Sequence, residues 1–160
     1  MEWYEVVSEL VVVWFLWTLL HEAAHALAAK LLMKAQDFKF NLYPHINEQK
    51  KFLFASVSWI TPGTTRTDTK EALVLLAPRV MSLVAVIAFP FLLLFSMPLA
   101  MFWAILWGAG LVDLFVGSLG ISKASDLRRA AELLKFNPTV IRILGFAAII
   151  ASIFASLSTQ

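Results

Sequence analysis

The 160-residue sequence contains no cysteine, which excludes disulfide bonds and thiol chemistry. Charge is also scarce, because Asp, Glu, Lys and Arg make up only 15% of the chain and the formal net charge is +2. No run of basic residues concentrates that small charge on one segment. We therefore expect no nucleic-acid partner, since binding to a phosphate backbone depends on clustered positive charge.

Apolar residues, in contrast, are abundant. They make up 60% of the chain, with six Trp and thirteen Phe, and the mean hydropathy is +0.78. Soluble domains are nearer half apolar, so the composition predicts an integral membrane protein in contact with the lipid bilayer. The length suits one domain, residues 1–160. The first residues are acidic rather than basic and no small-residue cleavage site follows, so we expect the first hydrophobic helix to remain in the mature protein.

Hydropathy predicts a mainly α-helical, polytopic fold with about four transmembrane helices, at residues 6–33, 69–95, 99–119 and 139–157. Pro78 and Pro90 are expected to interrupt the second span, and the second and third spans could instead form a broken or re-entrant pair. A short amphipathic helix is expected over residues 127–134, opened by Ser125 or Asp126.

Lys and Arg gather in the two long loops, one between the first and second spans and one between the third and fourth. The turn near Ser96 and the carboxyl-terminal tail carry no charge, and the amino terminus is acidic. Positive residues favour the cytoplasm, so both long loops are expected there and both termini on the opposite side.

Within the first long loop the apolar pattern changes to a period of two. Phe38, Phe40 and Leu42 alternate with polar residues, and a second apolar run covers residues 52–60. This pattern predicts a small β-hairpin on the cytoplasmic membrane surface, closed by Thr61-Pro62-Gly63-Thr64. The hairpin could simply cover the helix ends, or its exposed edge could pair with an extended substrate segment.

The most informative motif is the pentad His21-Glu22-Ala23-Ala24-His25 inside the first span. Residues four apart on a helix lie about 40° apart around its axis, so His21 and His25 share one face and can bind one metal ion. Glu22 lies beside that face, where a carboxylate can take a proton from water. Ionisable residues are costly inside a bilayer and usually functional there. The pattern favours a zinc hydrolase with Glu22 as catalytic base.

A catalytic zinc usually has a third protein ligand, and the residues alone leave its identity open. His45 lies in the polar hairpin, where a solvated surface role is expected. Asp113 lies at a depth similar to that of His25, but Arg79 falls at that depth too, and an ion pair between them would satisfy both charges. Asp126 follows a polar break that can turn the chain back toward the histidines, although it could instead only cap a helix.

The pentad, followed by Ala26-Leu27 at the cytoplasmic end of a membrane helix, resembles the site-2 proteases, which are intramembrane zinc metalloproteases. More narrowly, the chain is similar to small bacterial and archaeal membrane proteins classed as zincin peptidases. The match extends over nearly the whole chain, with further matching segments at Thr61-Pro62-Gly63-Thr64, Leu76-Ala77-Pro78, and Ser125-Asp126-Leu127 through Phe136-Asn137-Pro138. The chain departs from the site-2 proteases in having no Leu-Asp-Gly motif, and Ser118 stands where those proteases carry an Asn.

This resemblance implies Zn²⁺ held by His21, His25 and Asp126, and cleavage of a peptide bond in a membrane protein or peptide substrate. At 1.5 Å per residue, His25 would lie about 12 Å inside the cytoplasmic end of its helix, so the active site is expected toward that side. Two alternatives remain: a metal-binding membrane scaffold or regulatory partner without protease activity, and a small transporter whose His-Glu-His cluster lines an ion path.

Overall fold

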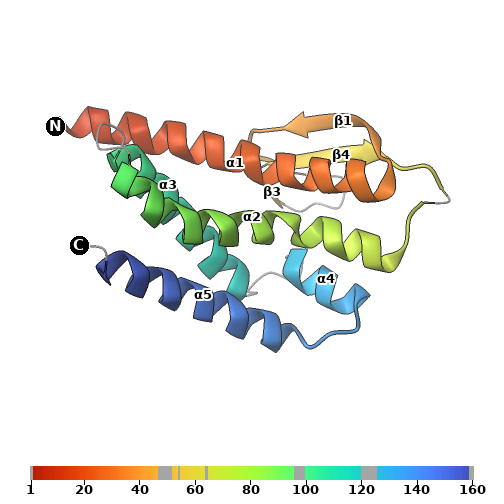
Figure 1. Cartoon of the computed structure of the whole chain (residues 1–160). Helices are drawn as coiled ribbons and strands as arrows, with labels where there is room; N and C mark the ends of the chain where they lie inside the picture. The colour runs from red at the N-terminus through yellow and green to blue at the C-terminus, as the bar shows by residue number, and fades with distance from the viewer. Residues whose placement is uncertain are drawn as a thin grey trace.

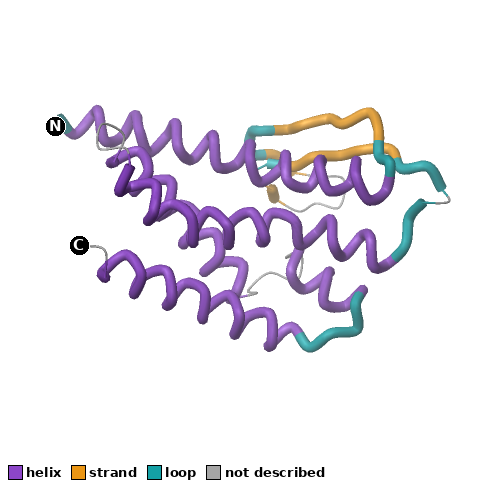
Figure 2. Tube along the Cα trace, viewed as in Figure 1, coloured by secondary structure: helices purple, strands orange, loops and turns teal. Residues whose placement is uncertain are grey.

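The computed structural model describes residues 2–46, 52–53, 55–63, 65–95, 100–119 and 126–158. Along the chain the elements are α1 (Trp3–Met33), β1 (Gln36–Asn41), β2 (His45–Ile46), β3 (Phe52–Leu53), β4 (Ser56–Ile60), α2 (Asp68–Phe95), α3 (Ala100–Leu119), α4 (Asp126–Leu133) and α5 (Pro138–Ser158). Figure 1 shows α1, α2 and α5 running side by side, with the start of α1 and the end of α5 at the same end of the helices. The strands lie beside the carboxyl-terminal half of α1 (Figure 2).

Four helices of the described chain, α1, α2, α3 and α5, are long and apolar enough to cross a membrane. Their outward faces carry exposed large apolar side chains such as Leu31, Val84 and Phe154. Such faces are stable against lipid rather than water. The predicted multi-pass membrane fold with about four spans is therefore confirmed.

The second span differs from the sequence-based prediction, because α2 is one helix across both Pro78 and Pro90. The carbonyl that Pro78 leaves without its helical partner, that of Val74, accepts a hydrogen bond from His25 Nδ1 at 2.8 Å. A proline in a helix interior removes one backbone hydrogen bond but need not end a transmembrane helix when neighbouring groups take up the freed carbonyl.

The hairpin forms two short antiparallel ladders rather than one. β1 pairs with β4, with Phe40 opposite Val57, and β2 pairs with β3. Pro44 lies between β1 and β2, where its lack of an N–H prevents a continuous ladder. The hairpin tip at residues 47–51 lies outside the described residues.

Apolar packing ties the hairpin to the helices. Trp59 of β4 packs on a buried cluster formed by Ala29, Met33 and Val74, which joins the end of α1 to α2. The predicted turn after β4 is present, since the Thr65 amide donates to the Pro62 carbonyl at 3.1 Å, while Thr64 lies outside the described residues. The strand β4 is thereby held against the part of α1 that carries His21 and His25.

The amphipathic helix α4 packs on the amino-terminal half of α2. Its buried residues, Leu127, Ala130 and Ala131, follow the spacing of one helix face. Ala130 meets Ala72 of α2 in a cluster where both side chains are fully buried. Two alanines in contact let the helix backbones approach closely, and this close approach carries Asp126, the first residue of α4, toward α1.

Candidate metal centre

His21 and His25 lie one helical turn apart on α1, with ring centroids 5.4 Å apart and planes at 74°. The His25 side chain is 9% exposed and that of His21 is 18% exposed. Both rings are thus withdrawn from the helix exterior and face α2, α3 and α4. The spacing of the pentad places both imidazoles at one site, as the sequence predicts.

A backbone carbonyl of α2 sets the orientation of His25. Its Nδ1 lies 2.8 Å from the Val74 carbonyl oxygen and therefore donates a hydrogen to it. Val74 is four residues before Pro78, which has no N–H to bond that carbonyl within the helix. The proline thus frees an acceptor for His25, and Nε2 is the ring nitrogen left to bind a metal.

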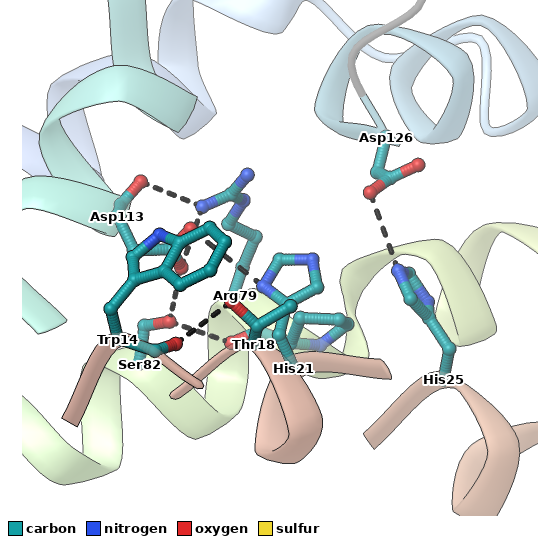
Figure 3. Close-up of polar contacts among 9 residues, drawn as sticks. Trp14, Thr18, His21, His25, Arg79, Ser82, Asp113 and Asp126 are labelled. Atoms are coloured by element: carbon teal, nitrogen blue, oxygen red, sulfur yellow. Dashed lines mark hydrogen bonds and ion pairs between the residues drawn. The ribbon is translucent and has the colours of Figure 1, made fainter. Parts of the chain in front are cut away.

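The carboxylate of Asp113 on α3 lies beside His21, at a longer distance than the carbonyl that bonds His25. One oxygen, Oδ1, lies 3.7 Å from His21 Nδ1. The other, Oδ2, receives hydrogen bonds from Arg79 Nη1 at 2.8 Å and from the Ser82 hydroxyl at 2.5 Å. Arg79 Nη1 also donates to the Asp113 backbone carbonyl at 2.7 Å. The expected ion pair between Asp113 and Arg79 is confirmed, and Figure 3 shows both on the side of His21 away from His25.

Asp126 is the carboxylate that meets His25. Its Oδ2 lies 3.3 Å from His25 Nε2, the ring nitrogen not used by Val74 (Figure 3). Burial raises the pKa of the Asp126 carboxyl, but the hydrogen bond and charge of His25 outweigh burial and hold the pKa below its usual range. The same contact brings a carboxylate oxygen and the second ring nitrogen of His25 within reach of one metal ion.

Three donors converge at this point: one atom each from His21, His25 and Asp126 lies within 4.8 Å of the others. Bonds of about 2.0–2.2 Å to a tetrahedral zinc place two ligand atoms roughly 3.3 Å apart. His25 Nε2 and Asp126 Oδ2 have that separation. Small movements of the His21 side chain would bring its ligand nitrogen to the same distance. The group could hold a metal ion, and two imidazoles with one carboxylate suit zinc.

Glu22 lies next to these donors and is 9% exposed. The backbone of Val57, in β4, faces its carboxylate. Glu22 also lines a cavity of about 790 Å³ between α1 and α3, together with His21, Asp113 and Asp126. A carboxylate placed beside the three donors and in the same cavity can exchange a proton with a water or substrate there.

The same cavity extends away from the polar groups along the apolar faces of α1 and α3. Its lining includes Leu10, Trp14, Val112 and Val116, which are each about half exposed or more. Exposed apolar residues on membrane-spanning helices face lipid. The cavity therefore reaches from the polar cluster to the lipid-facing surface between the two helices.

His45 lies apart from this cluster, in β2. Its Nδ1 donates to the Tyr43 carbonyl at 2.8 Å and its Nε2 lies 3.0 Å from the Ser56 hydroxyl. The interpretation of His45 as part of the hairpin surface agrees with these contacts. The sequence-based reasoning did not anticipate the roles of Ser82 and the Val74 carbonyl, although a proline inside a helix always leaves the carbonyl four residues earlier without its helical partner.

Comparison with known proteins adds no relative: no family model, no curated protein and no solved structure matches this chain.

Proposed function

We propose that this protein is an intramembrane zinc metallopeptidase that cleaves a peptide bond in a membrane-associated protein segment near the cytoplasmic face. The observation that carries the proposal is the convergence of His21, His25 and Asp126 beside Glu22, within an otherwise apolar helix bundle. Three protein donors with an adjacent carboxylate are typical of catalytic zinc sites, whereas structural sites use four protein ligands. Zinc held there would act as a Lewis acid and make water nucleophilic at neutral pH.

The residues of the chain divide the remaining work. Glu22 takes a proton from the attacking water and passes it to the leaving nitrogen of the cleaved peptide bond. The Val74 carbonyl bonds Nδ1 of His25, and the Asp113 carboxylate lies 3.7 Å from Nδ1 of His21, which leaves Nε2 of each ring available to the ion. Arg79 and Ser82 keep Asp113 in position.

The cavity between α1 and α3 favours a substrate that comes from the membrane. Its apolar lining reaches the lipid-facing surface, and its polar end contains Glu22 and Asp126. A helical substrate hides its carbonyls in internal hydrogen bonds, so the segment that is cleaved must be unwound where it meets Glu22. The positive charges of the long loops support an orientation in which this end of the bundle faces the cytoplasm.

A metal analysis joined to a cleavage assay tests the proposal. We expect about one zinc per chain, with His21→Ala and His25→Ala each losing most of it, because two ligands do not retain zinc as three do. The same preparations are incubated with a panel of membrane-anchored peptides, and the products are identified by mass spectrometry. Full zinc occupancy in the variant lacking both histidines would contradict the site.

Glu22→Gln separates an enzyme from a metal-binding scaffold. The amide cannot accept the proton but changes the ligand set little, so zinc should remain while cleavage stops. Equal cleavage by this variant and the parent would exclude the peptidase. Zinc binding without cleavage of any peptide by the parent would favour the scaffold instead.

A further inference from the structure

A second cavity, of about 480 Å³, lies between β4, the end of α1, the first turns of α2 and α4. Two residues connect it to the metal centre. Val57, whose backbone faces Glu22, and Val74, whose carbonyl accepts the hydrogen of His25, both line this cavity. The cavity is therefore the immediate neighbour of the proposed catalytic residues.

The charged residues that line this cavity, among those that the structure describes, are Arg66, Arg129 and Glu71. Both arginines share the one carboxylate: Arg66 Nη2 lies 2.8 Å from Glu71 Oε2, and Arg129 Nη2 lies 3.4 Å from Glu71 Oε1. One negative charge for two positive charges leaves the cluster with an excess of one positive charge. Each guanidinium has five N–H donors, more than these contacts use, so the cluster can accept a further carboxylate.

The backbone of β4 borders the same cavity. Within the described residues β4 pairs only with β1, so its opposite edge is unpaired, and Val57, Ser58 and Trp59 line the cavity. An unpaired strand edge can pair with an extended peptide. From Val57 to Thr61 such a peptide would cover four residue steps, about 13 Å.

From these observations, we propose that the Arg66–Arg129 cavity binds an acidic side chain of the substrate, within about four residues of the segment that meets Glu22. This inference rests on the proposed peptidase function and adds a substrate class: a membrane-associated segment with an Asp or Glu on its cytoplasmic side. The apolar part of the segment lies in the α1–α3 cavity, and its acidic part lies between β4, Arg66 and Arg129.

An anionic lipid headgroup would meet the same positive charge. A peptide is favoured because one cavity is bordered by the edge of β4, by the Val57 backbone that faces Glu22 and by the two arginines. A lipid headgroup could use the arginines but would make no use of the strand edge or the Val57 backbone. The side chains of Arg66 and Arg129 are 63% and 53% exposed. Both are open to a ligand, and their replacement should leave the fold intact.

The test measures binding without turnover. The full chain with Glu22→Gln is placed in phosphatidylcholine nanodiscs and titrated with fluorescent membrane-anchored peptides in which Glu, Gln or Lys scans single positions. We expect a position at which the Glu peptide binds about 10-fold more tightly than the Gln peptide, since two exposed ion pairs contribute about threefold each. The preference should shrink in high salt.

The double variant Arg66→Gln with Arg129→Gln should lose this preference and bind Glu and Gln peptides equally. Arg128→Gln is the matched control, because Arg128 is on the same helix but pairs with Glu132 at 3.1 Å and lines a different cavity. It removes one positive charge from the same helix outside the cavity and should keep the preference.

Three results would overturn the inference. One is an equal affinity for Glu and Gln peptides at every position, and another is a preference that survives the double arginine variant. The third is a lipid site, recognised when phosphatidylglycerol nanodiscs stabilise the parent but not the double variant and no peptide shows the preference. If the parent cleaves no peptide while acid-selective binding persists, the peptidase proposal fails and the acidic site stands. If the parent cleaves peptides but shows no selectivity for an acidic residue, the acidic site fails and the peptidase proposal stands.

Discussion

Replacing Pro78 with alanine tests whether a helix-interior proline prepares the metal site. The ring lies in α2, is fully buried, and leaves the Val74 carbonyl without the amide that would normally bond to it. His25 Nδ1 uses that carbonyl at 2.8 Å. Alanine at position 78 restores an N–H that competes with His25 for the same oxygen, so the imidazole should be held less firmly.

Two effects of this change act in opposite directions. Groups that orient a metal-binding histidine typically contribute 10–100-fold to metal affinity. The Val74 carbonyl can accept two hydrogen bonds, so His25 should keep part of its contact in the variant. We therefore expect zinc binding to weaken by about 10-fold, the lower limit of that range. The helix itself should gain, since proline costs roughly 3 kcal/mol relative to alanine in a helix interior. Loss of the two buried ring carbons offsets about 2 kcal/mol of that gain. The metal-free variant should therefore be at least as stable as the parent.

The assay is a zinc titration against a competing chelator, combined with thermal unfolding of the metal-free protein in detergent. Pro90→Ala is the control, because it removes a proline from the same helix 12 residues, or about 18 Å, further along. Weaker zinc binding with unchanged or higher thermal stability in Pro78→Ala alone would support the reasoning. Zinc affinity equal to that of the parent would refute it, and a variant that simply unfolds at lower temperature would show that Pro78 acts through packing.

Further variants test the other parts of the site. Asp126→Ala should lower zinc affinity by more than 100-fold, because it removes one of the three metal ligands. Its thermal stability should change little, because the side chain is 28% exposed. Zinc titration and thermal unfolding in detergent measure the two effects. Asp113→Ala should lower the free energy of unfolding by about 3–5 kcal/mol, because it leaves the Arg79 charge unpaired, and adding Arg79→Ala should recover part of the loss. Zinc loss from Asp113→Ala but not from Asp126→Ala would mean that the donor is misassigned. Gly117→Ala should weaken the ion pair between Asp113 and Arg79, since an added Cβ would lie 2.6 Å from Arg79 Nη1. Thermal unfolding should then show a lower stability, and unchanged stability would contradict this prediction.

Several features of this protein follow from the sequence alone. Four long apolar stretches predict four membrane helices, because a bilayer requires about 20 apolar residues per crossing and the observed helix bounds differ little from the predicted ones. The face shared by His21 and His25 follows from helix geometry, which needs no knowledge of neighbouring elements. The burial of Leu127, Ala130 and Ala131 likewise follows the spacing of one face of a short helix.

The roles of the two aspartates, in contrast, depend on tertiary packing. Asp113 and Asp126 are both far from the pentad in sequence, and burial makes each need a partner, so local pattern cannot rank them. The contact of Ala130 with Ala72 carries Asp126 to His25, while Arg79 and Ser82 hold Asp113 beside His21 Nδ1. Which side chains meet is determined by how closely helices pack, and that distance depends on residues outside the motif.

The same limit applies to the Val74 carbonyl and to the Arg66–Arg129 cavity. A proline at position 78 predicts a carbonyl without a helical partner, but only the approach of α1 to α2 shows that His25 is the group that takes it. Arg66 lies in the loop before α2 and Arg129 lies in α4, far apart in the sequence. The packing of α4 on α2 brings both to the carboxylate of Glu71. Sequence thus determines the elements and the paired histidines, whereas contacts between elements determine which other groups complete the site, because those contacts arise only when the apolar faces pack together.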